Sequence, residues 1–209
     1  MGKSKEVNIK DVQLRSNNIA KGVKLIDKSD LNKLRREIYA KGNKRDICVF
    51  EMLNNLGVRV SELISFELED IKLTERNGTN TFSYIVVREG KGCKYREIPI
   101  NSDVKNAIKE YLEVRPITKE SKLLIGERGA LQREAINRIL RKYCISAGIE
   151  SVNPHCLRSC LGTRLLKEKN VDIVTVSKIL GHSSITTTER YYLGTNMSHM
   201  ANALNSLVE

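Results

Sequence analysis

The 209-residue sequence lacks any long hydrophobic run, and its first ten residues, MGKSKEVNIK, contain no apolar stretch. A transmembrane helix needs about 20 consecutive apolar residues, and a secretory signal peptide needs an apolar region of roughly 7–15 residues. These absences argue against a membrane-bound or exported protein. We therefore expect a cytoplasmic location and no membrane partner.

Low-complexity segments and internal repeats are also missing. Apolar residues make up 40% of the chain and are spread along its whole length, while charged residues make up 29%. Such a composition excludes a disordered chain and a solenoid of repeats. One well-buried core can serve a chain of this length, so we expect one main domain.

A framework of several closely spaced cysteine pairs is lacking as well. The chain has an odd number of cysteines and no export signal; they are Cys48, Cys93, Cys144, Cys156 and Cys160. We expect reduced, mostly buried thiols. His155 near two of these cysteines could suggest a zinc site, but no second close pair completes a tetrahedral ligand set. We therefore expect no metal.

Acidic residues are in the minority. The chain has 36 Lys and Arg against 25 Asp and Glu, which gives a formal charge of +11. The long-range field of such a charge favours a polyanionic partner such as nucleic acid. The charge alone leaves a generically basic protein as an equal alternative.

What the sequence does contain is mostly helical spacing. Residues 1–24 hold few large apolar groups and several scattered cations, which predicts a basic N-terminal arm. Helices are predicted at residues 25–42, 46–57, within 58–71, and at 103–114, 131–149, 154–169, 172–180 and 184–192, with an amphipathic tail helix at about 196–208.

One segment is convincingly β. Residues 82–101 carry β-branched and aromatic runs on both sides of EGKG, which predicts a hairpin with Lys91 at its tip. Ser102 is placed to cap the helix that follows. The predicted fold class is therefore α+β, mostly helical with a small antiparallel sheet.

Several residues could carry chemistry, although each has a plain structural explanation. His155 and Arg158 stand three apart, so they share a helical face and could grip an anion, but a satisfied buried pair is as common. His182 lies at a helix break, which could be simple turn chemistry. Arg59 could be a surface cation, and Lys91 a solubilising lysine.

Four short boxes occur in order: GVRVSEL, GKGCKYREIPI, PHCLRSCLGTRLL and LGHSSITTTERYY. Together they resemble the catalytic domain of the tyrosine recombinase, or phage integrase, family over nearly the whole chain from about residue 25. The resemblance implies a mostly helical catalytic domain at 25–209 with a small antiparallel β-hairpin. It also implies six catalytic residues, which are Arg59, Lys91, His155, Arg158, His182 and Tyr191.

The resemblance also implies a role for each residue. Tyr191 attacks a DNA phosphodiester and forms a 3′-phosphotyrosyl link. The two arginines stabilise the negative charge that builds on the phosphate, and His182 hydrogen-bonds it. Lys91 protonates the leaving 5′-oxygen and His155 assists proton movement at the tyrosine. No metal or other cofactor is required.

The doublet Tyr191-Tyr192 leaves a choice of nucleophile. If a helix runs through ITTTERYY, Tyr192 lies seven residues from Ile185 and shares its buried face. Tyr191 is then turned about 100° away from that face. We predict that Tyr191 is the nucleophile and Tyr192 a packing residue, with the reverse assignment left open.

The implied partners are double-stranded DNA recombination sites and further copies of the chain, which form a tetramer on paired sites through the tail helix. The family's separate helical N-terminal domain has no counterpart before residue 25, so an accessory DNA-binding protein is a further expected partner. Two alternatives remain: a type IB topoisomerase, which rejoins the same strand, and a non-catalytic DNA-binding regulator on the same scaffold.

Overall fold

The computed structural model describes residues 25–73, 82–88 and 95–182. Several predictions lie outside these residues: the N-terminal arm at 1–24, the hairpin tip with Lys91, the helix at 184–192 with Tyr191 and Tyr192, and the tail helix at about 196–208. Within the described ranges no helix has both the length and the apolar character needed to cross a membrane.

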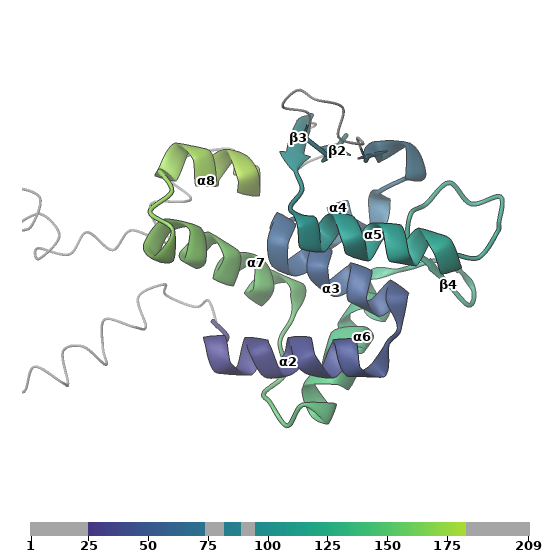
Figure 1. Ribbon diagram of the computed structural model, residues 1–209, viewed down its shortest axis with the longest axis horizontal. Helices are drawn as coiled ribbons and strands as arrows, with labels where there is room; N and C mark the ends of the chain where they lie inside the picture. The colour runs from purple at the N-terminus through teal and green to yellow at the C-terminus, as the bar shows by residue number, and fades with distance from the viewer. Residues whose placement is uncertain (1–24, 74–81, 89–94, 183–209) are drawn as a thin grey trace, which may run out of the picture.

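Helices make up most of the described chain, as predicted (Figure 1). Their bounds are α2 (Lys28–Lys41), α3 (Lys44–Leu56), α4 (Val60–Ser65), the 3-10 turn η1 (Leu68–Asp70), α5 (Ser102–Val114), α6 (Arg133–Ser146), α7 (Pro154–Thr163), the π-helical turn η2 (Arg164–Glu168) and α8 (Ile173–Leu180).

The centre of the molecule is α3, which lies among α2, α5, α6 and α7 (Figure 1). The predicted apolar positions Ile47, Phe50, Leu53 and Leu56 are all buried. So are the residues between them, Cys48 and Glu51 among them, except for the partly buried Asn55. A helix that is buried around almost its whole circumference is a core helix rather than a surface helix.

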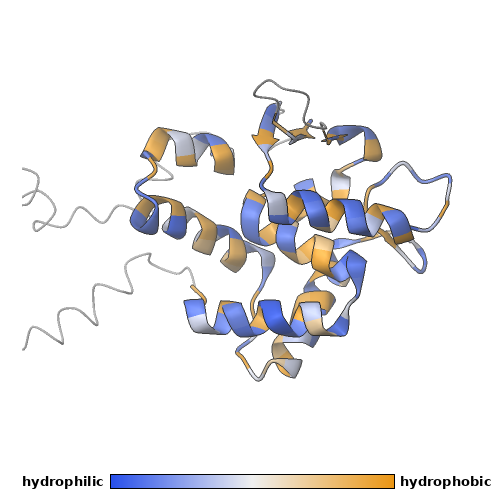
Figure 2. Cartoon of the chain, viewed as in Figure 1, coloured by the Kyte–Doolittle hydropathy of each residue, from blue (hydrophilic) through white to orange (hydrophobic). Residues whose placement is uncertain are grey.

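The outer helices are amphipathic. In Figure 2, α2 is largely hydrophilic, and its apolar residues Leu31, Leu34 and Ile38 are the ones buried against the core. Buried Ile136, Ile139, Leu140 and Tyr143 form the predicted stripe of α6. The stripe ends there, since Ala147 is the C-cap and only partly buried.

The predicted hairpin is present as two strands of a three-stranded antiparallel sheet in the order β1-β2-β3. The strands are β1 (Ile71–Lys72), β2 (Tyr84–Val87) and β3 (Arg96–Pro99), and Val87 pairs with Arg96. The short strand β1 was not predicted, nor was the small pair β4 (Ile125–Gly126) and β5 (Gly129–Ala130). Strands of two residues carry too little pattern to be recognised.

The predicted cap of α5 is wrong by one residue. Ser102 is the first helical residue, and the Asn101 side chain instead accepts a hydrogen bond from the Val104 N–H at 3.0 Å. Both residue types make good caps, but only the one with the extended backbone at the helix boundary can reach the free N–H groups. Here that residue is Asn101, with φ −80° and ψ 174°.

Replacing Asn101 tests this assignment. We expect Asn101→Ala to lower the free energy of unfolding by about 1 kcal/mol, because one N–H of the first turn loses its partner. Ser102→Ala, the matched control, is expected to change it by less than about 0.5 kcal/mol. Urea unfolding at pH 7 measures both values, and a larger loss for Ser102→Ala would contradict the assignment.

Candidate active site

The turn that carries Arg59 is set by Gly57 at the end of α3. Gly57 has φ 61°, and a Cβ at this position would lie 2.6 Å from Leu180 and 2.9 Å from Leu161. Glycine therefore both permits the left-handed turn and lets α7 and α8 pack against it. This contact places the end of α3 beside the end of α8.

Arg158 joins these two helix ends. It extends from α7, is 5% exposed, and donates hydrogen bonds to the Gly57 carbonyl and, at 2.6 Å, to the Leu180 carbonyl. These oxygens lie at the C-terminal ends of α3 and α8, where the helix dipole favours a cation. The buried guanidinium is thereby fixed from both sides.

Arg59 also links the end of α3 to the end of α8. Its Nη2 donates to the Gly181 carbonyl at 3.1 Å, and its Nη1 donates to Glu62 at 2.8 Å. The Arg59 side chain is 29% exposed, so it is less deeply buried than Arg158. The structure thus brings together two arginines that are far apart in the sequence.

His182 follows the left-handed Gly181, whose φ is 62°, at the end of α8. Burial and the positive charges of Arg158, Arg59 and Arg96 lower the pKa of His182 to about 4, with a smaller effect of His155. His182 is therefore neutral at pH 7 and offers one N–H donor without adding a charge.

His155 lies in the first turn of α7 and is exposed, in contrast to the buried Arg158. Asn153 caps this helix by accepting a hydrogen bond from the Cys156 N–H at 2.9 Å. Of the six predicted catalytic residues, the described part of the chain holds Arg59, His155, Arg158 and His182. The structure brings the two arginines and His182 together, with His155 close enough to influence the His182 charge.

Two charged residues of this cluster were not predicted. Glu62 is 2% exposed and accepts hydrogen bonds from the Arg59 backbone N–H at 2.8 Å and from the Arg96 guanidinium at 2.9 and 3.1 Å. Burial raises the pKa of Glu62, but the bonds from Arg96 and Arg59 outweigh it and hold the pKa below its usual value. The three-residue spacing of Arg59 and Glu62 could have predicted that Glu62 bonds the Arg59 backbone, since an acid three residues after the N-cap of a helix often forms a capping box.

The cluster as a whole is cationic, because Arg59, Arg96 and Arg158 surround one carboxylate and a neutral imidazole. Guanidinium groups bind phosphate oxygens through paired N–H donors and stay charged at any physiological pH. The arrangement therefore suits an anionic group such as a phosphodiester.

Cys48, Cys144, Cys156 and Cys160 are buried, as predicted, and none of them forms a disulfide within the described part of the chain; Cys93 lies outside the described residues. Within residues 25–73, 82–88 and 95–182, no three His, Cys, Asp or Glu side chains gather closely enough to hold a metal ion.

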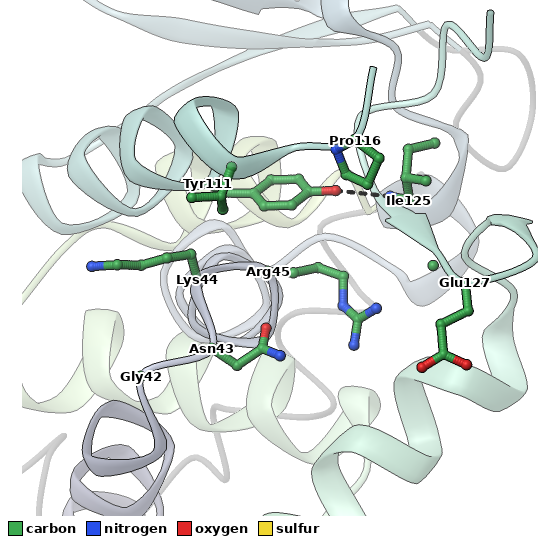
Figure 3. A pocket seen from close by; sticks show the side chains of 10 residues that line it. Gly42, Asn43, Lys44, Arg45, Tyr111, Pro116, Ile125 and Glu127 are labelled. Carbon is green, nitrogen blue, oxygen red and sulfur yellow. Dashed lines mark hydrogen bonds between the residues drawn. The ribbon is translucent and has the colours of Figure 1, made fainter. Parts of the chain in front are cut away.

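A separate pocket of about 420 Å³ lies at the other end of α3 (Figure 3). Lys44, Arg45 and Glu127 are among its lining residues, and inside it the Ile125 N–H donates to the Tyr111 hydroxyl at 2.9 Å. The 13 residues of α3 rise by roughly 20 Å, so the pocket is remote from the arginine cluster. Of the predicted catalytic residues that the structure describes, Arg59, His155, Arg158 and His182, none lines it.

This helical domain with its paired strands and arginine cluster matches a known class. The profile of the Phage integrase family matches residues 24–199. The chain therefore belongs to the phage integrase family, which confirms the resemblance drawn from the four boxes.

Similar proteins are consistent with this assignment. A tyrosine recombinase XerA of Thermococcus onnurineus (strain NA1) is 39% identical over 153 residues, which are 71% of this chain and 50% of that protein. A crystal structure of XerA recombinase aligns with a TM-score of 0.71 and 29% identity over 88% of this chain and 64% of that chain. XerH site-specific recombinase bound to difH substrate has the same fold, with a TM-score of 0.72 and 24% identity over 88% of this chain and 54% of that chain. The chain spans about half the length of the curated relatives it matches.

The charge state of His182 can be measured directly. We expect its imidazole to titrate near pH 4 in the folded protein, because burial disfavours the charged ring and protonation would place a further positive charge among the arginines. Inorganic phosphate bound in the cluster should raise this midpoint, since an anion favours the protonated ring. NMR of the imidazole nitrogens measures both, and the chain has only 3 histidines.

Spectra of His155→Gln and His199→Gln assign the His182 signal by elimination. A midpoint at or above the ordinary value of about 6.5 would contradict the described environment of His182.

Proposed function

We propose that this protein is a site-specific DNA recombinase of the tyrosine class, which cuts and rejoins DNA strands through a 3′-phosphotyrosyl intermediate. The observation that carries this proposal is the pair Arg59 and Arg158, fixed on the carbonyls of Gly57, Leu180 and Gly181 beside a neutral His182. Tyrosine recombinases among the similar proteins support it.

The arginine pair fits the needs of phosphoryl transfer. A phosphodiester is already anionic, and attack by a nucleophile adds negative charge to its non-bridging oxygens. Donors that are held in place before the reaction stabilise this charge without reorganising. Both guanidinium groups are held in this way, because each bonds two separate parts of the chain.

In the proposed reaction the Tyr191 oxygen attacks phosphorus and the bond from phosphorus to the 5′-oxygen breaks. The tyrosine proton leaves with the help of His155, and Lys91 gives a proton to the 5′-oxygen. A 5′-hydroxyl of a second strand then attacks the phosphorus of the phosphotyrosyl link and gives its proton to Lys91. The bond from phosphorus to the Tyr191 oxygen breaks, and that oxygen regains a proton with the help of His155. The strands are thereby exchanged. During both steps His182 donates its N–H to the phosphate.

The proposed substrate is double-stranded DNA at paired recombination sites, in keeping with the charge of +11 and with the DNA-bound XerH of the same fold. We further propose a tetramer on these sites, formed through the tail helix at about 196–208, and an accessory DNA-binding protein as a possible partner. The proposed recombinase would act in the cytoplasm, at the nucleoid.

Covalent capture tests the reaction without knowledge of the target site. The full chain is incubated with fragmented genomic DNA of its source organism, denatured with detergent, and the DNA-linked protein is digested for mass spectrometry. We expect a phosphotyrosyl peptide that contains Tyr191, an adduct with Tyr192→Phe, and none with Tyr191→Phe. Sequencing of the linked DNA ends identifies the site.

Other outcomes separate the alternatives. An adduct that survives Tyr191→Phe and vanishes with Tyr192→Phe reverses the choice of nucleophile. Relaxation of supercoiled plasmid without strand exchange at the identified site indicates a topoisomerase. No adduct with any variant leaves the non-catalytic DNA-binding regulator.

A further inference from the structure

Arg96 is a partly buried arginine at the start of β3, where it pairs with Val87 of β2. Its side chain is 13% exposed, and its Nη1 and Nη2 donate to the two carboxylate oxygens of Glu62 at 3.1 and 2.9 Å. Such a bidentate hydrogen bond fixes the orientation of a guanidinium as well as its distance from the carboxylate. Arg96 is therefore held rigidly to α4.

The same carboxylate holds Arg59. One oxygen of Glu62 accepts from the Arg59 Nη1 and the other from its backbone N–H, each at 2.8 Å. With the two bonds from Arg96, four donors occupy the roughly four acceptor positions of a carboxylate. The Glu62 carboxylate is thus saturated, and a change at Arg96 would alter how it holds Arg59.

Arg96 also touches the turn that carries His182. A Cβ at Gly181 would lie 2.6 Å from the Arg96 Cζ and 2.9 Å from its Nε, so the guanidinium packs directly on this backbone. The Nε is buried and makes no hydrogen bond to any residue that the structure describes. An unpaired buried donor costs stability. The placement of the Arg96 guanidinium is therefore better explained by its effect on the position of the Gly181-His182 turn than by the strength of its hydrogen bonds.

We propose that Arg96 is a positioning residue of the anion site, which holds Arg59 through Glu62 and the Gly181-His182 turn by direct contact. The expected effect of Arg96 on DNA cleavage rests on the proposed function. Its expected effect on anion binding does not. In the sequence, Arg96 follows Lys91, the proposed general acid, by five residues.

Arg96 acts on His182 by charge as well. His182 is surrounded by Arg158 and His155 of α7, by Arg59 before α4 and by Arg96 of β3, with the Glu62 carboxylate bonded to two of these arginines. Removing the Arg96 charge should raise the pKa of His182 toward its usual value. Replacing Arg96 by lysine should leave that pKa low while breaking the bidentate hydrogen bond.

The test compares Arg96→Gln and Arg96→Lys with Arg88→Gln and Arg88→Lys. Arg88 is a matched control, because it follows the neighbouring strand β2 and bonds the carboxylates of Asp70 and Glu69 away from the cluster. The full chain is used, and three quantities are measured: the adduct rate at saturating DNA on the captured site, the dissociation constant of inorganic phosphate, and the NMR midpoint of His182.

For Arg96→Gln we expect an adduct rate at saturating DNA about 10²-fold lower, because a misplaced catalytic group costs that much. Phosphate should bind about tenfold more weakly and the His182 midpoint should rise. Arg96→Lys should lose less rate and keep the midpoint. Neither Arg88 variant should change these values.

A merely structural Arg96 would lower the unfolding temperature and leave all three values of the folded protein unchanged, which would overturn the inference. If Arg96→Gln does not fold, the two lysine variants decide alone: an adduct rate and phosphate affinity equal to those of Arg88→Lys would overturn it. If the unaltered protein forms no adduct, the recombinase proposal fails, and the phosphate and His182 measurements still decide the role of Arg96.

Discussion

The contact between the C-terminal ends of α3 and α8 is the constraint on which the site depends. Gly57 and Gly181 end these helices in the left-handed conformation, and neither position has room for a Cβ. The carbonyls exposed there carry the negative ends of two helix dipoles. Arg158 and Arg59 satisfy these carbonyls, so the packing of the core and the placement of the two guanidinium groups are one structural feature.

This arrangement explains how a cluster of positive charges can exist inside a folded domain. Three arginines in one place repel each other, and burial makes each charge more costly. Glu62 offsets two of them directly, helix-end carbonyls stabilise Arg59 and Arg158, and His182 remains neutral. An excess of positive charge still remains, which a bound phosphate would neutralise. Binding of an anion would thus relieve the repulsion among the three arginines.

Much of this could be predicted from the sequence, because it is encoded locally. Helical spacing located the helices, β-branched runs located the hairpin, and four boxes located Arg59, His155, Arg158 and His182. Arg96 was missed because its partner Glu62 is 34 residues away and only folding brings them together. Asn101 and Ser102 are both good caps, so their order along the backbone, and not their chemistry, decides which one acts.

The most direct test of the central claim is the adduct rate of Arg158→Lys at saturating DNA. Lysine keeps the positive charge but lacks the planar guanidinium whose separate N–H donors bond the carbonyls of Gly57 and Leu180 simultaneously. If the fixed guanidinium stabilises the transition state, the rate falls by about 10²–10³-fold while DNA affinity changes little. A rate equal to that of the original protein would show that the charge alone suffices and would contradict the account.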